Sequence, residues 1–163
     1  MKKIFSIFLV FIICIGTLVG STNKGCIDAQ LVTLNYDEIK DKLIRFHVIA
    51  NSDSDEDQAV KLLVRDEVID YINVQLKDAT GIDEARDILK DNIEEVNNIA
   101  VNILRENGFD YEANTMISNE NFPDKVYGDY LFPQGNYEAF RIIIGNGEGH
   151  NWWCVMFPPL CFV

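Results

Sequence analysis

Apolar and polar positions alternate near residue 43 in a way that predicts a strand. The segment Leu43–Ala50 reads LIRFHVIA and is rich in the β-branched and aromatic residues that favour strands. Its two faces carry Ile44, Phe46 and Val48 on one side and Arg45, His47 and Ile49 on the other. Because the first set is wholly apolar, we expect that face to belong to the core.

Two helical patterns follow this strand. In the first, apolar residues recur at every fourth position, at Val60, Val64, Val68, Ile72 and Leu76. Asp53 or Ser54 is placed to cap its N-terminus, and Ser54 with Asp57 resembles a capping box. The second helix is predicted to open near Gly81 and to carry one apolar stripe until Gly108 stops it.

The remaining pattern is that of strands. Three segments have it, Tyr111–Ser118, Tyr137–Ile144 and Asn151–Phe157. The glycines from Gly145 to Gly149 predict a turn that joins the last two strands as a hairpin. The order βααβββ predicts an α+β domain in which two long helices pack on a mostly antiparallel sheet of about four strands.

The first residues have the layout of an export signal. Two lysines precede an uncharged apolar run from Ile4 to Val19. The run is shorter than the roughly 20 residues of a bilayer-spanning helix, so we predict a signal peptide over residues 1–22, with an uncleaved membrane anchor helix as the alternative. The positive leader stays cytoplasmic and directs the rest of the chain outward. Residues 23–42 are interpreted as a linker and lead-in, and residues 43–163 as a single exported domain.

Composition limits the classes of partner. The chain is 48% hydrophobic, enough for a real core, and carries 26 acidic against 14 basic residues, for a net charge of −12. Nucleic acids and anionic surfaces are bound through clustered Lys and Arg, whereas the basic residues here are scattered. We therefore expect no nucleic-acid partner and no broad contact with an anionic membrane beyond the N-terminal segment. The sequence has no phosphate-binding or dinucleotide motif, so no cofactor is predicted.

Three cysteines follow the leader, an odd number for an exported chain. Cys154 and Cys161 flank Pro158 and Pro159, which can turn the chain, so we predict a loop-closing disulfide between these two cysteines. Cys26 would then be free or would pair between molecules. Three free thiols in a reducing environment are the alternative.

A run of acidic residues resembles a calcium loop only in part. Asp53, Asp55 and Asp57 alternate as the first ligands of such a loop do. However, Gln58 stands where the loop needs a glycine, and Val64 stands where it needs a bidentate glutamate. Helix capping is therefore the better explanation of these acids, and no metal site is predicted.

A second candidate is a thiol-protease site. His150, Asn151 and Cys154 supply its residue types, with His47 as an alternative base. Groups three and four residues apart on one strand cannot converge as such a site requires, because its members come from distant segments. We therefore predict no assembled catalytic site.

The last strand carries two adjacent tryptophans. Trp152 and Trp153 must face opposite sides of a sheet, so they cannot both enter one core. A tryptophan near the surface is a common binding anchor. The alternative is that the helices cover one face of the sheet and the segment Phe122–Gly135 covers the other.

Two long blocks of the sequence resemble the stage II sporulation protein R family. They are Arg45–Val68, RFHVIANSDSDEDQAVKLLVRDEV, and Tyr127–Phe162, which includes GEGHNWWCV. With the leader and the connecting helices, the resemblance covers essentially the whole exported domain. It implies a signal that is made in the forespore of an endospore-forming bacterium and exported into the space between forespore and mother cell. There such a protein activates a membrane-embedded septal aspartic protease, which cleaves the precursor of sigma factor E.

We expect the domain to bind that protease without catalysing a reaction itself. The predicted contact surface joins the end of the first strand to the last glycine turn and comprises His47, Asn51, Asp53, Glu148, His150, Asn151 and Trp152. The alternative is an exported cell-wall or peptide hydrolase, with Cys154, Glu148 or Asp53 in its chemistry. A structural domain of the spore envelope is a third alternative.

Overall fold

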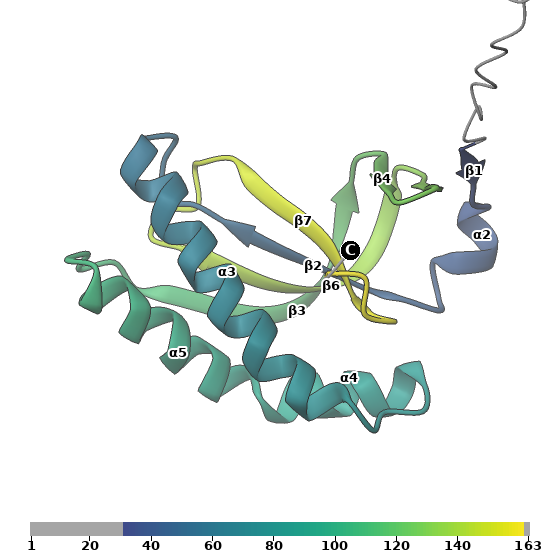
Figure 1. The fold of residues 1–163 in the computed structure, drawn as a ribbon, viewed down its shortest axis with the longest axis horizontal. Helices are drawn as coiled ribbons and strands as arrows, with labels where there is room; N and C mark the ends of the chain where they lie inside the picture. The colour runs from purple at the N-terminus through teal and green to yellow at the C-terminus, as the bar shows by residue number, and fades with distance from the viewer. Residues whose placement is uncertain (1–30, 162–163) are drawn as a thin grey trace, which may run out of the picture. The chain divides into compact units, whose positions relative to one another are not determined.

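The computed structural model describes residues 31–161 of the chain (Figure 1). The elements in order are β1 (Val32–Thr33), α2 (Tyr36–Ile39), β2 (Ile44–Ile49), α3 (Asp55–Leu76), α4 (Ile82–Asp91), α5 (Ile93–Glu106), β3 (Ala113–Phe122), β4 (Lys125–Tyr127), β5 (Tyr130–Phe132), β6 (Gly135–Ile144) and β7 (Asn151–Phe157). This is the predicted α+β class. The predicted leader and Cys26 lie outside the described residues. Within residues 31–161, no helix combines the length and the apolar character needed to cross a membrane.

The four predicted strands form one sheet in the order β3-β6-β2-β7. β2 pairs in parallel with β6 and antiparallel with β7, and β3 pairs antiparallel with β6. The predicted hairpin between the last two strands is wrong, because β2 lies between them. All residues of β2 are buried, and a strand covered on both faces belongs inside a sheet. The connection from β6 to β7 therefore crosses the end of β2.

The helices α3, α4 and α5 pack on one face of this sheet (Figure 1). Their apolar stripes and the even-numbered residues of β2 form the main core, which confirms the predicted core face. The predicted second long helix is divided into α4 and α5, which meet at Asn92. The Asn92 side chain donates to Ile88 O at 2.8 Å and accepts from the Tyr71 hydroxyl at 2.7 Å. Both bonds are made where α4 ends. In the sequence, the continuous apolar stripe gave no sign of this break between the two helices.

A smaller core lies on the other face of the sheet and comprises Leu43, Phe122, Phe132, Tyr137, Ala139 and Val155. The segment Phe122–Gly135 contains β4 and β5 and contributes Tyr127 and Phe132 to this core, so both faces of the sheet are covered. β5 lies between β4 and β1 in a second sheet of three strands. β1 and α2 fall in the segment interpreted as a linker and have only two and four residues, too few for a periodic pattern.

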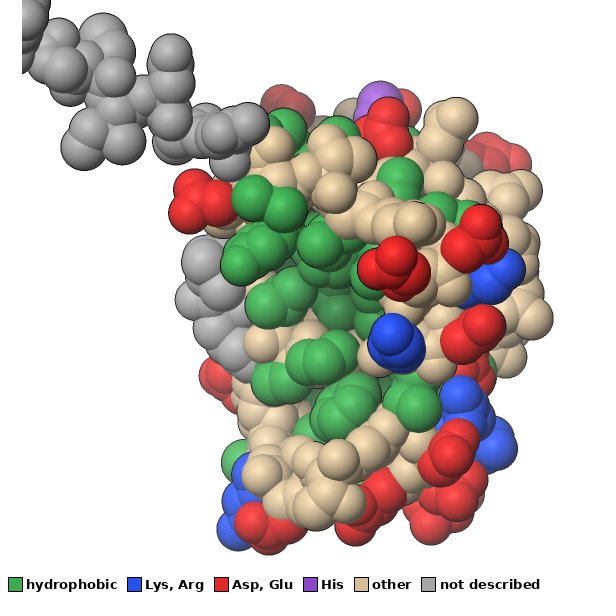
Figure 2. Space-filling view, turned by 90° about the vertical axis from the view of Figure 1, so that its right-hand side faces the viewer, with side chains coloured by type: hydrophobic (Ala, Val, Ile, Leu, Met, Phe, Trp, Pro, Cys, Tyr) green, Lys and Arg blue, Asp and Glu red, His purple; other side chains and the backbone are tan. Residues whose placement is uncertain are grey.

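An apolar hollow of 330 Å³ opens beside the smaller core. Hydrophobic side chains gather on the corresponding side of the molecule (Figure 2). The hollow is lined by Leu34, Ile39, Lys42, Leu43, Tyr130, Phe132, Val155, Pro158 and Leu160. Its walls therefore come from segments at opposite ends of the described chain, and Lys42 is the one charged residue among them.

Candidate partner-binding site

The candidate site lies where the connection from β6 to β7 crosses the end of β2. It consists of residues 50–57 and 145–150, which we call the rim. Backbone N–H groups of Asn146 and Glu148 donate to Asn51, at 2.9 Å to its side-chain Oδ1 and at 3.2 Å to its backbone O. These bonds bring the two halves of the predicted contact surface together.

Two glycines of the rim allow this close approach. Gly145 has φ 55°, in the left-handed region that favours glycine. A β-carbon on Gly149 would lie 2.2 Å from Ser52 O and 2.9 Å from the Ala50 β-carbon. The glycines therefore serve close packing against the end of β2, and not the hairpin that the sequence predicted.

Asp57 is the centre of the rim's hydrogen bonds, although it is only 3% exposed. Its carboxylate accepts from Ser52 Oγ at 2.6 Å and from Asn51 Nδ2 at 2.9 Å. Its backbone N–H donates to Ser54 Oγ at 3.2 Å, so Ser54 caps α3 as predicted. Burial alone would raise the pKa of Asp57, but hydrogen bonds from Ser52, Asn51 and Tyr111 outweigh burial and lower the pKa below its usual 3.8. The rim is thus built around a buried, ionised carboxylate.

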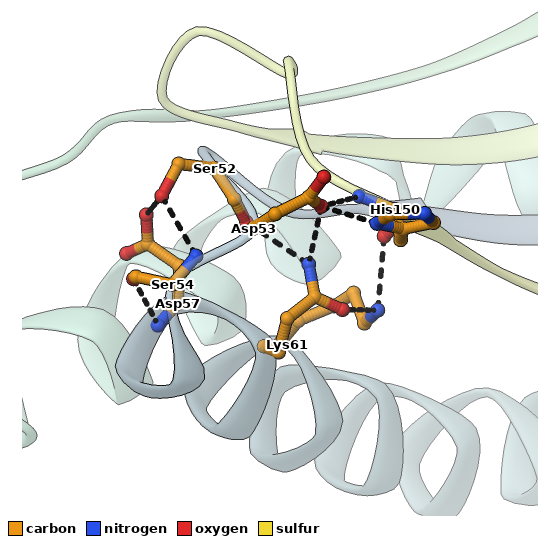
Figure 3. Close-up of polar contacts among 7 residues, drawn as sticks. Ser52, Asp53, Ser54, Asp57, Lys61 and His150 are labelled. Atoms are coloured by element: carbon orange, nitrogen blue, oxygen red, sulfur yellow. Dashed lines mark hydrogen bonds and ion pairs between the residues drawn. The ribbon is translucent and has the colours of Figure 1, made fainter.

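Asp53 and His150 form an exposed pair on the rim (Figure 3). Asp53 Oδ1 accepts from His150 N at 2.6 Å and lies 2.5 Å from His150 Nδ1. Hydrogen bonds from the backbone and ring of His150 lower the pKa of Asp53. Lys61, on α3, donates to His150 O at 2.9 Å. The backbone of His150 is therefore held from two sides, while its side chain is 80% exposed.

All but one of the predicted contact residues lie at the rim or at the adjoining start of β7. Asp53, Glu148 and His150 are exposed, and Asn51, Asn151 and Trp152 are partly exposed. His47 is the exception. It is 2% exposed, and its ring stacks on Trp153 with centroids 4.9 Å apart. His47 is too buried to contact a partner in this structure, so we remove it from the candidate surface.

Trp152 and Trp153 face opposite sides of the sheet, as predicted. Trp152 packs edge to face on Phe46 of the main core, with centroids 5.9 Å apart. The Arg65 guanidinium lies 4.9 Å from the Trp152 ring. Trp153 contacts Phe122 of the smaller core, with centroids 4.7 Å apart. Trp152 is therefore the aromatic residue that connects the rim to the surface of α3.

The face of the sheet opposite α3, α4 and α5 holds two arginines and a neutral histidine among aromatic rings. This cation–aromatic layer comprises Arg45, His47, Arg141, Phe122, Tyr137 and Trp153. Arg45 is fully buried, with its guanidinium carbon 4.4 Å from the Phe122 ring and 5.0 Å from the Tyr137 ring. Its Nη2 donates to the Tyr127 hydroxyl at 3.4 Å, whereas Nε and Nη1 have no hydrogen-bond partner in the described part of the chain. Burial lowers the pKa of Arg45.

His47 in the same layer is held neutral. Burial, followed by the nearby charges of Arg141 and Arg45, lowers the pKa of His47 from 6.5 to about 3. Neither ring nitrogen has a hydrogen-bond partner within residues 31–161. Arg141 in turn forms an ion pair with Glu120. Protonation of His47 would therefore place a further positive charge in a buried region that already contains two.

Cys154 and Cys161 are neighbours, and both are free thiols in this structure. Cys161 Sγ donates to Val155 O at 3.0 Å. The neighbouring Cys154 thiol, together with burial, raises the pKa of Cys161 well above its usual value. The disulfide between them stays a prediction.

The catalytic and metal patterns weighed in the sequence do not assemble. Cys154 is 2% exposed and belongs to the main core, whereas His150 bonds to Asp53 at the rim. The carboxylates of Asp53 and Asp57 are directed to different protein groups. Across residues 31–161, no group of three or more His, Cys, Asp and Glu side chains is arranged to hold a metal ion.

Sequence reasoning missed three residues that hold the rim, Ser52, Gln58 and Lys61. Gln58 Nε2 donates to Ser52 O at 2.9 Å, and its Oε1 accepts from Lys61 Nζ at 2.5 Å. Lys61 is only 5% exposed, and burial lowers its pKa. In the sequence, Gln58 and Lys61 resemble the solvated face of an ordinary helix, because only the distant turn at His150 supplies the partner of Lys61.

Known proteins of one family are similar to this chain. The family model described as Stage II sporulation protein R matches residues 40–163. The chain is 40% identical over 162 residues to Stage II sporulation protein R of Bacillus subtilis (strain 168), an alignment that covers 99% of this chain and 71% of that protein. No solved structure matches the chain. The chain therefore belongs to the stage II sporulation protein R family.

Proposed function

We propose that this chain is an exported signal of endospore formation that activates a membrane-embedded septal aspartic protease. The protease then processes the sigma-E precursor in the mother cell. Family membership supports the role in sporulation. The apolar leader over residues 1–22 supports export across the forespore membrane into the intermembrane space, with the leader either removed or kept as an anchor. In this proposal the domain acts as a ligand and not as an enzyme.

The construction of the rim is the observation that carries this proposal. It presents the exposed side chains of Asp53, Glu148 and His150 on backbone that is fixed by hydrogen bonds. A surface that is already rigid loses little conformational freedom on binding. Trp152 adds a partly exposed aromatic side chain of the kind that anchors protein interfaces.

Activation requires only a difference in affinity between two states of the protease. If the rim binds the active state more tightly than the inactive state, binding shifts the equilibrium toward the active state. A tenfold shift needs about 1.4 kcal/mol of differential binding free energy. The net charge of −12 favours a docking surface on the protease that carries basic residues.

The test is processing of the sigma-E precursor in a non-sporulating host that carries the septal protease. We expect processing only when this chain is also produced, and its loss when residues 1–22 are deleted. Absence of processing with folded and exported chain present contradicts the proposal, as does processing that does not depend on the chain.

The same host distinguishes a ligand from an exported hydrolase. Glu148→Gln keeps the shape of the side chain and removes only its charge. We expect this variant to retain most processing, because one conservative change in an interface usually has a modest effect. Complete loss of processing by a folded Glu148→Gln variant would instead favour the hydrolase.

A further inference from the structure

Within residues 31–161, the outer edge of β7 has backbone groups without a partner beside the rim. β7 is an edge strand of the four-stranded sheet. In an antiparallel pair, alternate residues direct both backbone groups toward the neighbouring strand, and the residues between them direct both groups away. Val155 O accepts from Leu160 N at 3.2 Å and from Cys161 Sγ at 3.0 Å, so Val155 faces outward. By alternation, Trp153 and Asn151 also face outward.

Only part of this outer edge is covered within residues 31–161. The segment Pro158–Cys161 folds back and bonds to Val155, but Asn151 and Trp153 have no partner for their outward backbone groups in the described chain. The strand sequence NWWCVMF contains no charge and no proline to prevent further pairing. The opposite edge strand, β3, is protected by the charged Glu120 and by several asparagines. Among the described residues, the first half of β7 is thus the open edge of the sheet.

A surface hollow of 420 Å³ lies next to this open edge and is lined by Arg65, Asp66, Ile69, Asp70, Trp152 and Cys161. Its volume falls in the range of about 300–1,000 Å³ that is typical of binding pockets. Arg65 pairs with Asp66 at 2.6 Å, and its guanidinium lies over the Trp152 ring. Asp70 is exposed, and no Lys or Arg of residues 31–161 forms an ion pair with it. Within the described part of the chain, the hollow therefore has one acidic charge without a basic partner.

We propose that β7 receives an extended segment of the protein partner, which adds as a strand along Asn151–Trp153 and places a basic side chain near Asp70. Strand addition supplies main-chain hydrogen bonds, and the side-chain hollow supplies specificity. The net charge of −12 favours a basic segment and disfavours a second copy of this chain. The inference specifies how the partner at the rim is held, so it rests on the proposed function. The apolar hollow beside Leu43 is a weaker candidate, because nothing in residues 31–161 identifies its occupant.

Hydrogen exchange tests this strand addition directly, with the septal protease in nanodiscs as the probe. In the free protein, the outward amides of Asn151 and Trp153 should exchange rapidly, and the inward amides of Trp152 and Cys154 slowly. Binding of the protease is expected to slow exchange at Asn151 and Trp153 by at least about tenfold. Measured binding without this protection overturns the strand addition and leaves the proposed function intact. Absence of both binding and processing overturns the two together.

A proline variant provides a second test of the edge. Asn151→Pro removes an outward N–H and should reduce binding of the nanodisc-embedded protease at least about tenfold. The matched control is Asn119→Pro on β3. Gly145 N donates to Glu112 O, so alternation from Glu112 places the N–H of Asn119 on the outer side of β3. A folded Asn151→Pro variant that binds as tightly as the natural chain contradicts the proposal.

A variant at Asp70 tests the role of the acidic charge in the hollow and leaves the sequence of β7 unchanged. Asp70→Lys should weaken binding by about tenfold at low ionic strength and less at high ionic strength, because the lost attraction is electrostatic. Asp91→Lys, at the end of α4, makes the same change in net charge and should have little effect. Equal affinities for the two variants would contradict a basic side chain near Asp70, even if Asn151→Pro did not fold.

Discussion

The rim and the cation–aromatic layer both adjoin β2, but they differ in the hydrogen bonding of their buried polar groups. At the rim, the buried carboxylate of Asp57 is surrounded by donors from Ser52 and Asn51. In the layer, Arg45 and His47 have buried nitrogens without a hydrogen-bond partner in the described residues. A buried polar group lowers stability unless a partner compensates its lost hydration.

This difference indicates separate roles for the two regions. The hydrogen bonds of the rim fix the backbone that presents Asp53 and His150 to the outside. In the layer, aromatic faces around Arg45 compensate the lost hydration of its charge, and the neutral form of His47 avoids burying a further charge. We therefore expect changes at the rim to affect stability and signalling together, and changes in the layer to affect mainly the response to acid.

The largest expected effect is at the centre of the rim. Asp57→Ala should lower the free energy of unfolding by about 3 kcal/mol, because it leaves several buried donors without an acceptor. The contribution of Asp57 should be present above pH 3.8 and lost as the pH falls through its lower folded-state pKa. Urea unfolding measures both effects. Asp55→Ala, an exposed acid in the same helical turn, is the control and should cost less than about 0.5 kcal/mol. Equal losses for the two variants would show that Asp57 is not central.

The glycine contact gives the next largest effect. Gly149→Ala places a methyl group against the Ser52 backbone and should lower the free energy of unfolding by about 2 kcal/mol. It should also reduce processing of the sigma-E precursor, since the turn at His150 has to move. Gly81→Ala is the control, because its β-carbon would meet nothing within 4 Å. The close contact is refuted if the two variants have the same stability and activity.

In the layer, His47→Phe should make the protein less sensitive to acid. His47 has a folded-state pKa of about 3 against 6.5 when unfolded, so the unfolded chain takes up the proton first as the pH falls. The stabilisation is complete above pH 6.5 and declines toward pH 3. Between pH 6.5 and 4.5, the natural chain should lose about 2 kcal/mol more stability than the variant. Urea unfolding at the two pH values measures this difference, and parallel losses would show that His47 does not cause it.

The smallest expected effect is at Arg45. Arg45→Met keeps most of the side-chain volume and removes a buried charge that has no carboxylate partner within residues 31–161. Its stability should be unchanged or higher by up to about 1 kcal/mol, measured by thermal or urea unfolding. A loss of more than about 2 kcal/mol would show that the aromatic faces compensate the charge fully.

The elements that depend on local pattern could be predicted from the sequence. β2, α3 and the Ser54 cap were predicted because alternation, helical period and capping are properties of neighbouring residues. The pairing of β6 and β7 with β2 was missed, because strand order depends on contacts between distant segments. The break at Asn92 was missed for a similar reason, since one of its bonds comes from Tyr71 on another helix.

For the candidate site, the sequence suggested several residues but not the contacts between them. Asp53 and His150 were both identified, although no local pattern shows that one bonds to the other. His47 was placed on the surface because the alternation of β2 does not reveal that Phe122 and Trp153 cover its second face. Lys61 was missed because its partner, His150 O, lies at the far end of the chain.

The most direct test of the account is processing of the sigma-E precursor by a variant changed at the rim and at the adjoining Trp152 that remains folded and exported. A chain with Glu148→Ala, His150→Ala and Trp152→Ala should reduce processing at least about tenfold. A control with Val74→Ala and Lys77→Ala, two exposed positions near the other end of α3, should process the precursor normally. Full processing by the folded rim variant would contradict the claim that this surface contacts the protease.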